Sequence, residues 1–130
     1  MMNKPPYFQE RVQGRVRAEL VGGDEPETQT GGRLKHYKVR LFVDTQNPEV
    51  QNVTYKLDPT YYDPVRESRD ADRNFEVSLS TYGDYPVTVE AQVGGEIVRY
   101  TAPLLALLRE SHGNTTSEAI RAALEDIAKH

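Results

Sequence analysis

The sequence predicts an all-β fold, an immunoglobulin-like antiparallel β-sandwich that carries a C-terminal amphipathic α-helix. Three observations support this prediction: short runs of alternating apolar and polar residues, turn-forming residues between the runs, and a change of period near the end of the chain. Alternation with a period of two is typical of a strand that buries one face. Several such runs at near-regular spacing favour a sandwich over a barrel or an α/β fold.

The first two predicted strands surround a polar insert. Apolar residues alternate with charged or polar ones over residues 12–20 and again over residues 37–43. The insert at residues 24–30 has nothing to bury and lies between two Gly-Gly pairs, so we expect a mobile connection there. Arginines and lysines on the outward faces of both strands would form a basic stripe. We expect cross-strand pairing with Glu19 to neutralise this stripe, in preference to anion binding.

The same alternation predicts four more strands, over residues 53–57, 75–79, 87–93 and 97–100. The pair Gly94-Gly95 lies between the last two of them and indicates a hairpin turn.

The pattern changes after Pro103. The leucines of residues 104–112 fit a short helix or an irregular strand, and the pattern leaves both open. Thr115 and Glu118 match a capping box, which predicts a final helix whose apolar stripe is Ile120, Ala123, Leu124 and Ile127. We therefore expect a sandwich domain over residues 1–103 and a helical extension over residues 104–130 that packs on it. Docking of this helix on a partner chain is the alternative.

Composition excludes several classes of function. The 130 residues suffice for one domain. A net charge of -4 argues against binding to nucleic acid or to an anionic membrane. The absence of cysteine rules out disulfides, thiolate metal sites and a cysteine nucleophile. With no apolar run of the length of a secretory signal or a membrane span, we expect a cytoplasmic protein.

Motifs for metal, cofactor or catalytic chemistry are weak in this chain. Its histidines are scattered, and residues 70–74 imitate the start of a calcium loop only until Phe75, where glycine is needed. We expect no metal, no cofactor and no enzymatic activity. The remaining enzymatic alternative is a carboxylate pair made by Asp58 and Asp63. Both precede proline, however, which favours a turn-forming role.

Two aromatic turns, at residues 58–64 and 81–85, are the segments most suited to ligand contact. Together they contain four of the eight tyrosines. Aromatic rings on exposed turns frequently contact ligands.

These turns resemble those of YEATS domains, in particular the prokaryotic YEATS-like family. The family pattern is a strand ending in Leu-His-x-Ser/Thr-Phe, a nearby Pro-x-Arg, and a later Gly-Trp/Tyr-Gly-Glu/Ala-Phe turn. Here the corresponding residues are Leu-Asp-Pro-Thr-Tyr at 57–61, Pro-Val-Arg at 64–66 and Thr-Tyr-Gly-Asp-Tyr at 81–85. The resemblance covers roughly residues 34 to 93.

The resemblance implies an immunoglobulin-like sandwich and a role in recognising acylated lysine between two aromatic rings. By motif position the rings are Tyr61 and Tyr82, and the hydroxyl that binds the amide is that of Thr60. The backbone N–H of Tyr82 would meet the acyl carbonyl, and Gly83 follows it in the same turn.

Two residues of the implied site depart from the family pattern. Asp58 stands where acyl-lysine readers carry histidine, and Arg33 stands where they have another pocket aromatic. A carboxylate beside tyrosine faces favours a cation, whereas a turn cap before Pro59 is the structural explanation of Asp58.

From the resemblance we expect a non-catalytic module that binds a protein or peptide, with acylated lysine as the leading ligand. The expected binding residues are Asp58, Thr60, Tyr61, Tyr82, Gly83 and Arg33. The alternative is a structural protein–protein interaction module of a bacterial signalling or conflict system, without a small-ligand pocket.

Overall fold

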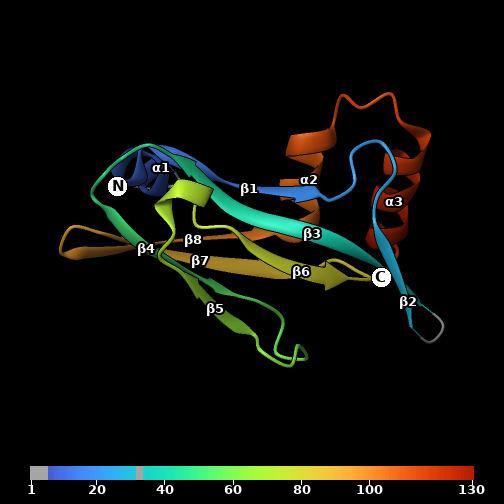
Figure 1. Cartoon of the computed structure of the whole chain (residues 1–130), viewed down its shortest axis with the longest axis horizontal. Coiled ribbons are helices and arrows are strands. Elements are labelled where there is room, and N and C mark those ends of the chain that lie inside the picture. Colours follow the sequence, from blue (N-terminus) through green and yellow to red (C-terminus); the bar gives the residue numbers. More distant parts are fainter. Residues whose placement is uncertain (1–5, 32–33) are drawn as a thin grey trace.

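The computed structural model describes residues 6–31 and 34–130, which form two facing antiparallel sheets with helices at their ends (Figure 1). Within these residues the strands are β1 Gly14–Leu20, β2 Thr28–Gly31, β3 Leu34–Thr45, β4 Val50–Lys56, β5 Val65–Ser68, β6 Val77–Thr81, β7 Pro86–Val93 and β8 Glu96–Pro103. The helical segments are α1 Pro6–Val12, the 3-10 turn η1 Ala71–Arg73, α2 Leu104–His112 and α3 Glu118–Ala128.

Strand β3 is the centre of the first sheet. Val39 pairs with Leu20 of β1 and with Leu79 of β6, so β1 and β6 lie on opposite sides of β3. Strand β2 lies on the same side of β3 as β1. Its partner on β3, Tyr37, pairs with β6 on the opposite side. The second sheet has the order β5-β4-β7-β8. Each sheet turns one face toward the other, which confirms the predicted all-β sandwich.

The core lies between the two sheets and is built by the alternate residues that the period of two predicted. Its fully buried side chains include Val39, Leu41, Val43, Val53, Tyr55, Val89 and Ala91. Their burial removes apolar surface from water, the main driving force of folding.

Some boundaries differ from the predictions at the N-terminal end of the chain. Val12 ends α1 instead of beginning a strand, and Gln13, with a left-handed φ of 58°, separates the helix from β1. Part of the insert expected to be a mobile connection is strand β2, whose pairing with β3 satisfies backbone groups without any apolar side chain.

Two differences occur in the middle of the chain. Strand β5 was not predicted, and it pairs with β4. The strand expected from Phe75 begins at Val77, because Asn74 and Phe75 have left-handed φ values of 55° and 58°. Phe75 nevertheless belongs to the core, with 2% of its surface exposed.

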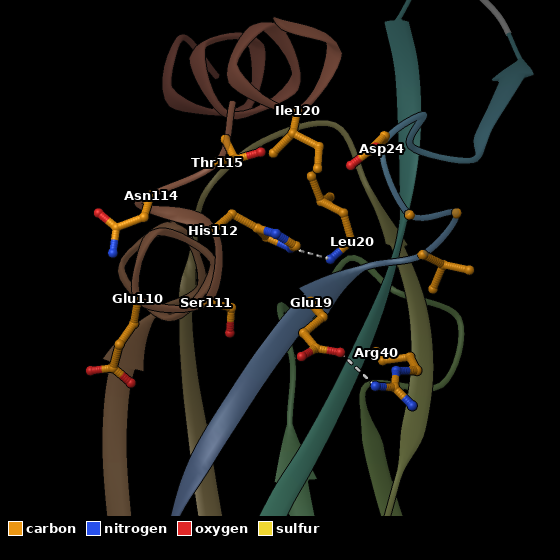
Figure 2. A pocket seen from close by; sticks show the side chains of 13 residues that line it. Glu19, Leu20, Asp24, Arg40, Glu110, Ser111, His112, Asn114, Thr115 and Ile120 are labelled. Atoms are coloured by element: carbon orange, nitrogen blue, oxygen red, sulfur yellow. Dashed lines mark hydrogen bonds and ion pairs between the residues drawn. The ribbon is translucent and has the colours of Figure 1, made fainter. Parts of the chain in front are cut away.

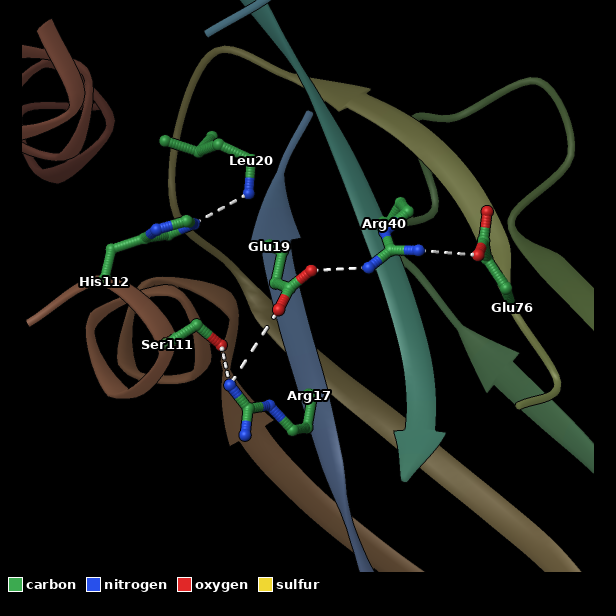
Figure 3. A network of polar contacts seen from close by, with 7 residues as sticks. All are labelled: Arg17, Glu19, Leu20, Arg40, Glu76, Ser111 and His112. Carbon is green, nitrogen blue, oxygen red and sulfur yellow. Dashed lines mark hydrogen bonds and ion pairs between the residues drawn. The ribbon is translucent and has the colours of Figure 1, made fainter. Parts of the chain in front are cut away.

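The predicted basic stripe is neutralised by carboxylates, as expected. Arg40 on β3 bonds Glu19 of β1 at 2.5 Å and Glu76 at 3.0 Å, and Arg17 lies 3.9 Å from Glu19 (Figure 3). This face of the sheet therefore presents paired charges, not a basic surface.

The C-terminal region forms two helices at one end of the sandwich, whereas α1 lies near the other end (Figure 1). Residues 104–112, for which the sequence left two possibilities, are the helix α2, which packs on β1 and β8. The predicted stripe of α3 is buried, and α3 packs on α2. None of the helices among the described residues is both long and apolar enough to cross a membrane.

The predicted capping box of α3 is wrong. Ser117, not Thr115, is the N-cap, and its hydroxyl oxygen accepts the N–H of Ile120. Ser117 also donates to the carbonyl of Asp24 at 2.7 Å, so the cap fastens α3 to the loop that follows β1.

His112 connects α2 to strand β1. Its Nε2 accepts the backbone N–H of Leu20 at 2.9 Å (Figure 3). Burial lowers the pKa of His112, the charge of Glu19 opposes this, and the charge of Arg17 adds to it. Because an imidazolium nitrogen is a donor, protonation would break the bond to Leu20.

We predict that acid weakens the packing of α2 through His112. The folded state lowers the pKa of this group, so the unfolded chain binds the proton more readily. The stability that the neutral ring contributes is present above the unfolded pKa of about 6.5 and is lost as the pH falls below it. Urea unfolding of the wild type and of His112→Gln between about pH 7.5 and about pH 5.5 measures this effect.

The wild type should lose more stability than the variant over this interval, by on the order of 1 kcal/mol or less, because the ring is only half-buried. The other histidines are present in both proteins. The difference between the two proteins in how the free energy of unfolding changes with pH therefore isolates His112. Equal changes in the two proteins would contradict this role of the histidine.

Candidate ligand-binding site

A hollow of about 340 Å³ lies where the loop between β4 and β5 meets the turn between β6 and β7. Five of the six residues that the sequence marked for ligand binding line it: Asp58, Thr60, Tyr61, Tyr82 and Gly83. The sixth, Arg33, lies outside the described residues. The fold therefore brings together two turns that are about twenty residues apart in the sequence.

Tyr61 is a fixed wall of this hollow. Its ring packs against the core, and its hydroxyl donates to the carbonyl of Ser80 at 2.6 Å. The hydroxyl of Tyr85 donates to the hydroxyl oxygen of Tyr61 at 3.1 Å, and the two rings meet edge to face at 5.6 Å. Burial raises the pKa of Tyr85, so its hydroxyl keeps the proton that it donates.

Tyr82 is the exposed aromatic of the hollow, with 45% of its surface accessible. Its ring has edge contacts with His36 at 5.4 Å and with His130 at 6.1 Å. The ladder between β3 and β6 ends at Thr81, so the backbone N–H of Tyr82 lies beyond its last pair. Tyr61 and Tyr82 thus line the same hollow, but the ring of Tyr61 contacts Tyr85, whereas the ring of Tyr82 contacts the two histidines.

The turn at residues 81–85 is closed by its own polar groups. The buried hydroxyl of Thr81 donates to the carbonyl of Gly83 at 2.6 Å and accepts the N–H of Gly83 at 3.2 Å. A carboxylate oxygen of Asp84 accepts the N–H of Leu105 at 2.9 Å and so satisfies a free donor of the first turn of α2. This bonding fixes the backbone from which Tyr82 projects.

The second polar feature of the hollow is the pair formed by Asp58 and Thr60. One carboxylate oxygen of Asp58 accepts both the Thr60 hydroxyl at 2.7 Å and the Thr60 N–H at 2.9 Å. The hydroxyl bond, followed by the backbone bond, lowers the pKa of Asp58. Asp58 thus forms the turn cap that its position before proline predicted, and it also lines the hollow.

Arg66 supports this site, although the sequence indicated it only as part of a motif. Its guanidinium donates to the carbonyls of Asp63 and Ser78 and lies 5.7 Å from the centre of the Tyr61 ring. It therefore ties the loop that carries Tyr61 to the free edge of β6. Its position after a Pro-Val pair was the only signal of this role.

Two histidines in the hollow were not predicted. His36 comes from β3, and His130 follows the C-terminal end of α3. Neither lies near the aromatic turns in the sequence. Strand pairing and helix packing bring them there, so no local pattern could have identified them.

A second hollow, of about 670 Å³, lies between the end of β1 and the α2–α3 connection (Figure 2). It is larger, but many of its polar groups are already bonded to one another. His112 binds Leu20, and Glu19 binds Arg40, whereas Ser111 accepts a bond from Arg17. We therefore consider the smaller aromatic hollow the better candidate.

The carboxylates give no support to a catalytic or metal site. Asp63 does not line the hollow with Asp58, so the carboxylate pair considered from the sequence is not assembled there. Across residues 6–31 and 34–130, no three histidine, aspartate or glutamate side chains gather in a way that could hold a metal ion.

The chain is similar to one protein family and to several solved structures. A family model described as prokaryotic YEATS domain matches residues 37–103. The chain is similar to the Yaf9 YEATS domain recognizing an H3K122suc peptide, with a TM-score of 0.53 and 16% identity over 70% of this chain and 68% of the other. The Yaf9 YEATS domain bound to H3K27ac gives a TM-score of 0.50 and 18% identity, again over 70% of this chain and 68% of the other.

The yeast AF-9 homolog protein Yaf9 gives a TM-score of 0.51 and 17% identity over 70% of this chain and 63% of the other. No curated protein matches the chain at a significant level. At these identities the solved structures demonstrate a shared fold, which confirms the predicted immunoglobulin-like sandwich.

We predict that Gly83→Ala loosens the contact between the aromatic turn and the end of α3. An added Cβ would lie 2.7 Å from the carbonyl carbon of His130, closer than packed atoms allow. The variant should lose about 1 kcal/mol in the free energy of unfolding, because the helix end must move away. Urea denaturation measures the loss. Gly95→Ala is the matched control, since nothing lies within 4 Å of its Cβ, and equal stability of both variants would contradict the packing.

Proposed function

Because the chain belongs to the prokaryotic YEATS domain family, we propose that it is a non-catalytic binding module that holds an acylated lysine side chain of a protein or peptide partner. The observation that carries this proposal is the hollow between the two aromatic turns. Tyr61 and Tyr82 both line it, and its volume of about 340 Å³ lies within the usual range for ligand pockets.

The groups around the hollow match the parts of an acyl amide. A flat amide stacks well on aromatic faces, as aromatic pairs do. The Thr60 hydroxyl and the backbone N–H of Tyr82 offer an acceptor and a donor for the amide N–H and carbonyl. Satisfying both amide groups matters, because a polar group buried without a partner costs binding energy.

The similar structures agree with this ligand class. The titles of two of them describe Yaf9 YEATS domains with H3K122suc and H3K27ac. For this chain, acylated lysine is an inference from the family and from the geometry of the hollow.

The charges of the chain support a protein or peptide partner over nucleic acid or a membrane surface. The net charge is -4, and the arginines of the sheet face are paired with glutamates. We place the domain in the bacterial cytoplasm, consistent with a prokaryotic family and a chain without cysteine.

A purely structural interaction module has less support. The apolar stripe of α3, which would be its natural docking surface, is buried against the rest of the chain. An open hollow with an exposed tyrosine is also unnecessary if the aromatic turns only close the end of the sandwich.

We predict that acetyl-lysine and crotonyl-lysine peptides bind the wild type and that Tyr82→Ala weakens their binding by about tenfold or more, because a stacking surface is lost. Isothermal titration calorimetry gives both affinities. Tyr62→Ala is the matched control, since Tyr62 is in the neighbouring turn, is fully exposed and does not line this hollow.

The control should bind like the wild type. Two results would reject the proposal: no binding of either peptide to the wild type at millimolar concentration, or equal losses in the two variants.

A further inference from the structure

Toward a ligand, the Thr60 hydroxyl can accept a hydrogen bond but cannot donate one. It has a single proton, which it donates to Asp58 at 2.7 Å. The described residues supply no donor to its oxygen, so toward the hollow Thr60 is an acceptor. A ligand group placed there must therefore bring a donor, such as the N–H of a secondary amide.

The charged groups that line the hollow are predominantly acidic. They include the carboxylates of Asp58 and Asp84, and among the described residues that line it there is neither lysine nor arginine. The Asp84 carboxylate faces the N-terminus of α2, where the helix dipole offsets part of its charge. Among the described residues the carboxylate of Asp58 is bonded by the neutral hydroxyl and N–H of Thr60, so its charge acts on the hollow most directly.

The arginine of the same loop is committed elsewhere. Arg66 donates to the carbonyls of Asp63 and Ser78, and it does not line the hollow. Among the described residues that line the hollow, a ligand that ends in a carboxylate would thus meet Asp58 and no lysine or arginine. Two like charges placed close together repel, which weakens binding of such a ligand.

We propose that Asp58 determines which acyl groups the hollow accepts. It sets Thr60 as an acceptor for the amide N–H, and its charge admits uncharged acyl groups while excluding acyl groups that end in a carboxylate. This inference rests on the proposed binding of acyl-lysine and adds the chemical class of the acyl group.

Two substitutions separate the charge of Asp58 from a general change in the charge of the loop. Asp58→Asn keeps a side-chain oxygen that can accept from Thr60 and removes the charge. Asp63→Asn makes the same change in the same loop at a residue that does not line the hollow. The probes are two peptides of one sequence, carrying acetyl-lysine or succinyl-lysine, measured by calorimetry at about pH 8, where imidazoles are ordinarily neutral.

The wild type and Asp63→Asn should bind the acetylated peptide about tenfold more tightly than the succinylated one. In Asp58→Asn the two affinities should lie within about threefold of each other. The inference is overturned if the wild type binds both peptides equally or prefers the succinylated one. It is also overturned if Asp58→Asn keeps the wild-type ratio, or if Asp63→Asn reduces the ratio as much as Asp58→Asn does.

The outcome also distinguishes this inference from the proposed function. Binding of both peptides without discrimination overturns the role of Asp58 alone. Binding of neither peptide overturns the proposed function, and this inference with it.

Discussion

Hydrogen bonds within and around the turn at residues 81–85 hold the candidate site together. The Thr81 hydroxyl bonds both the N–H and the carbonyl of Gly83, and Asp84 caps the start of α2. The carbonyl of Tyr85 accepts the N–H of Leu104 at 2.9 Å. One short turn therefore joins the two sheets, positions α2 and leaves the Tyr82 ring outside the core, where a ligand can reach it.

The loop between β4 and β5 is coupled to this turn through β6. Tyr61 bonds the carbonyl of Ser80, one residue before the turn begins, and Arg66 bonds the carbonyl of Ser78. These side chains occupy carbonyls of the free edge of β6, which would otherwise be open to pairing with another strand. The same contacts hold the two aromatic residues in fixed relative positions. Such preorganisation reduces the entropy that a ligand must overcome on binding.

The sequence predicted the parts of this fold that a local pattern encodes. Strands with one buried face were visible as alternation, and the turn residues Thr60, Tyr61 and Tyr82 were visible as family motifs. Strands β2 and β5 were not, because Thr-Gln-Thr-Gly and Val-Arg-Glu-Ser have no apolar face to alternate. The roles of His36 and His130 arise from contacts between distant segments. Nothing in the spacing of Thr115 and Glu118 revealed that Ser117 would cap α3 instead.

Amide NMR spectra recorded during titration with an acetyl-lysine peptide show whether the two aromatic turns together form the ligand site. Chemical-shift changes should concentrate at residues 58–61 and 81–85, while residues 110–115 beside the second hollow remain unchanged. Changes centred on residues 110–115, or changes in only one of the two turns, would contradict this placement of the site.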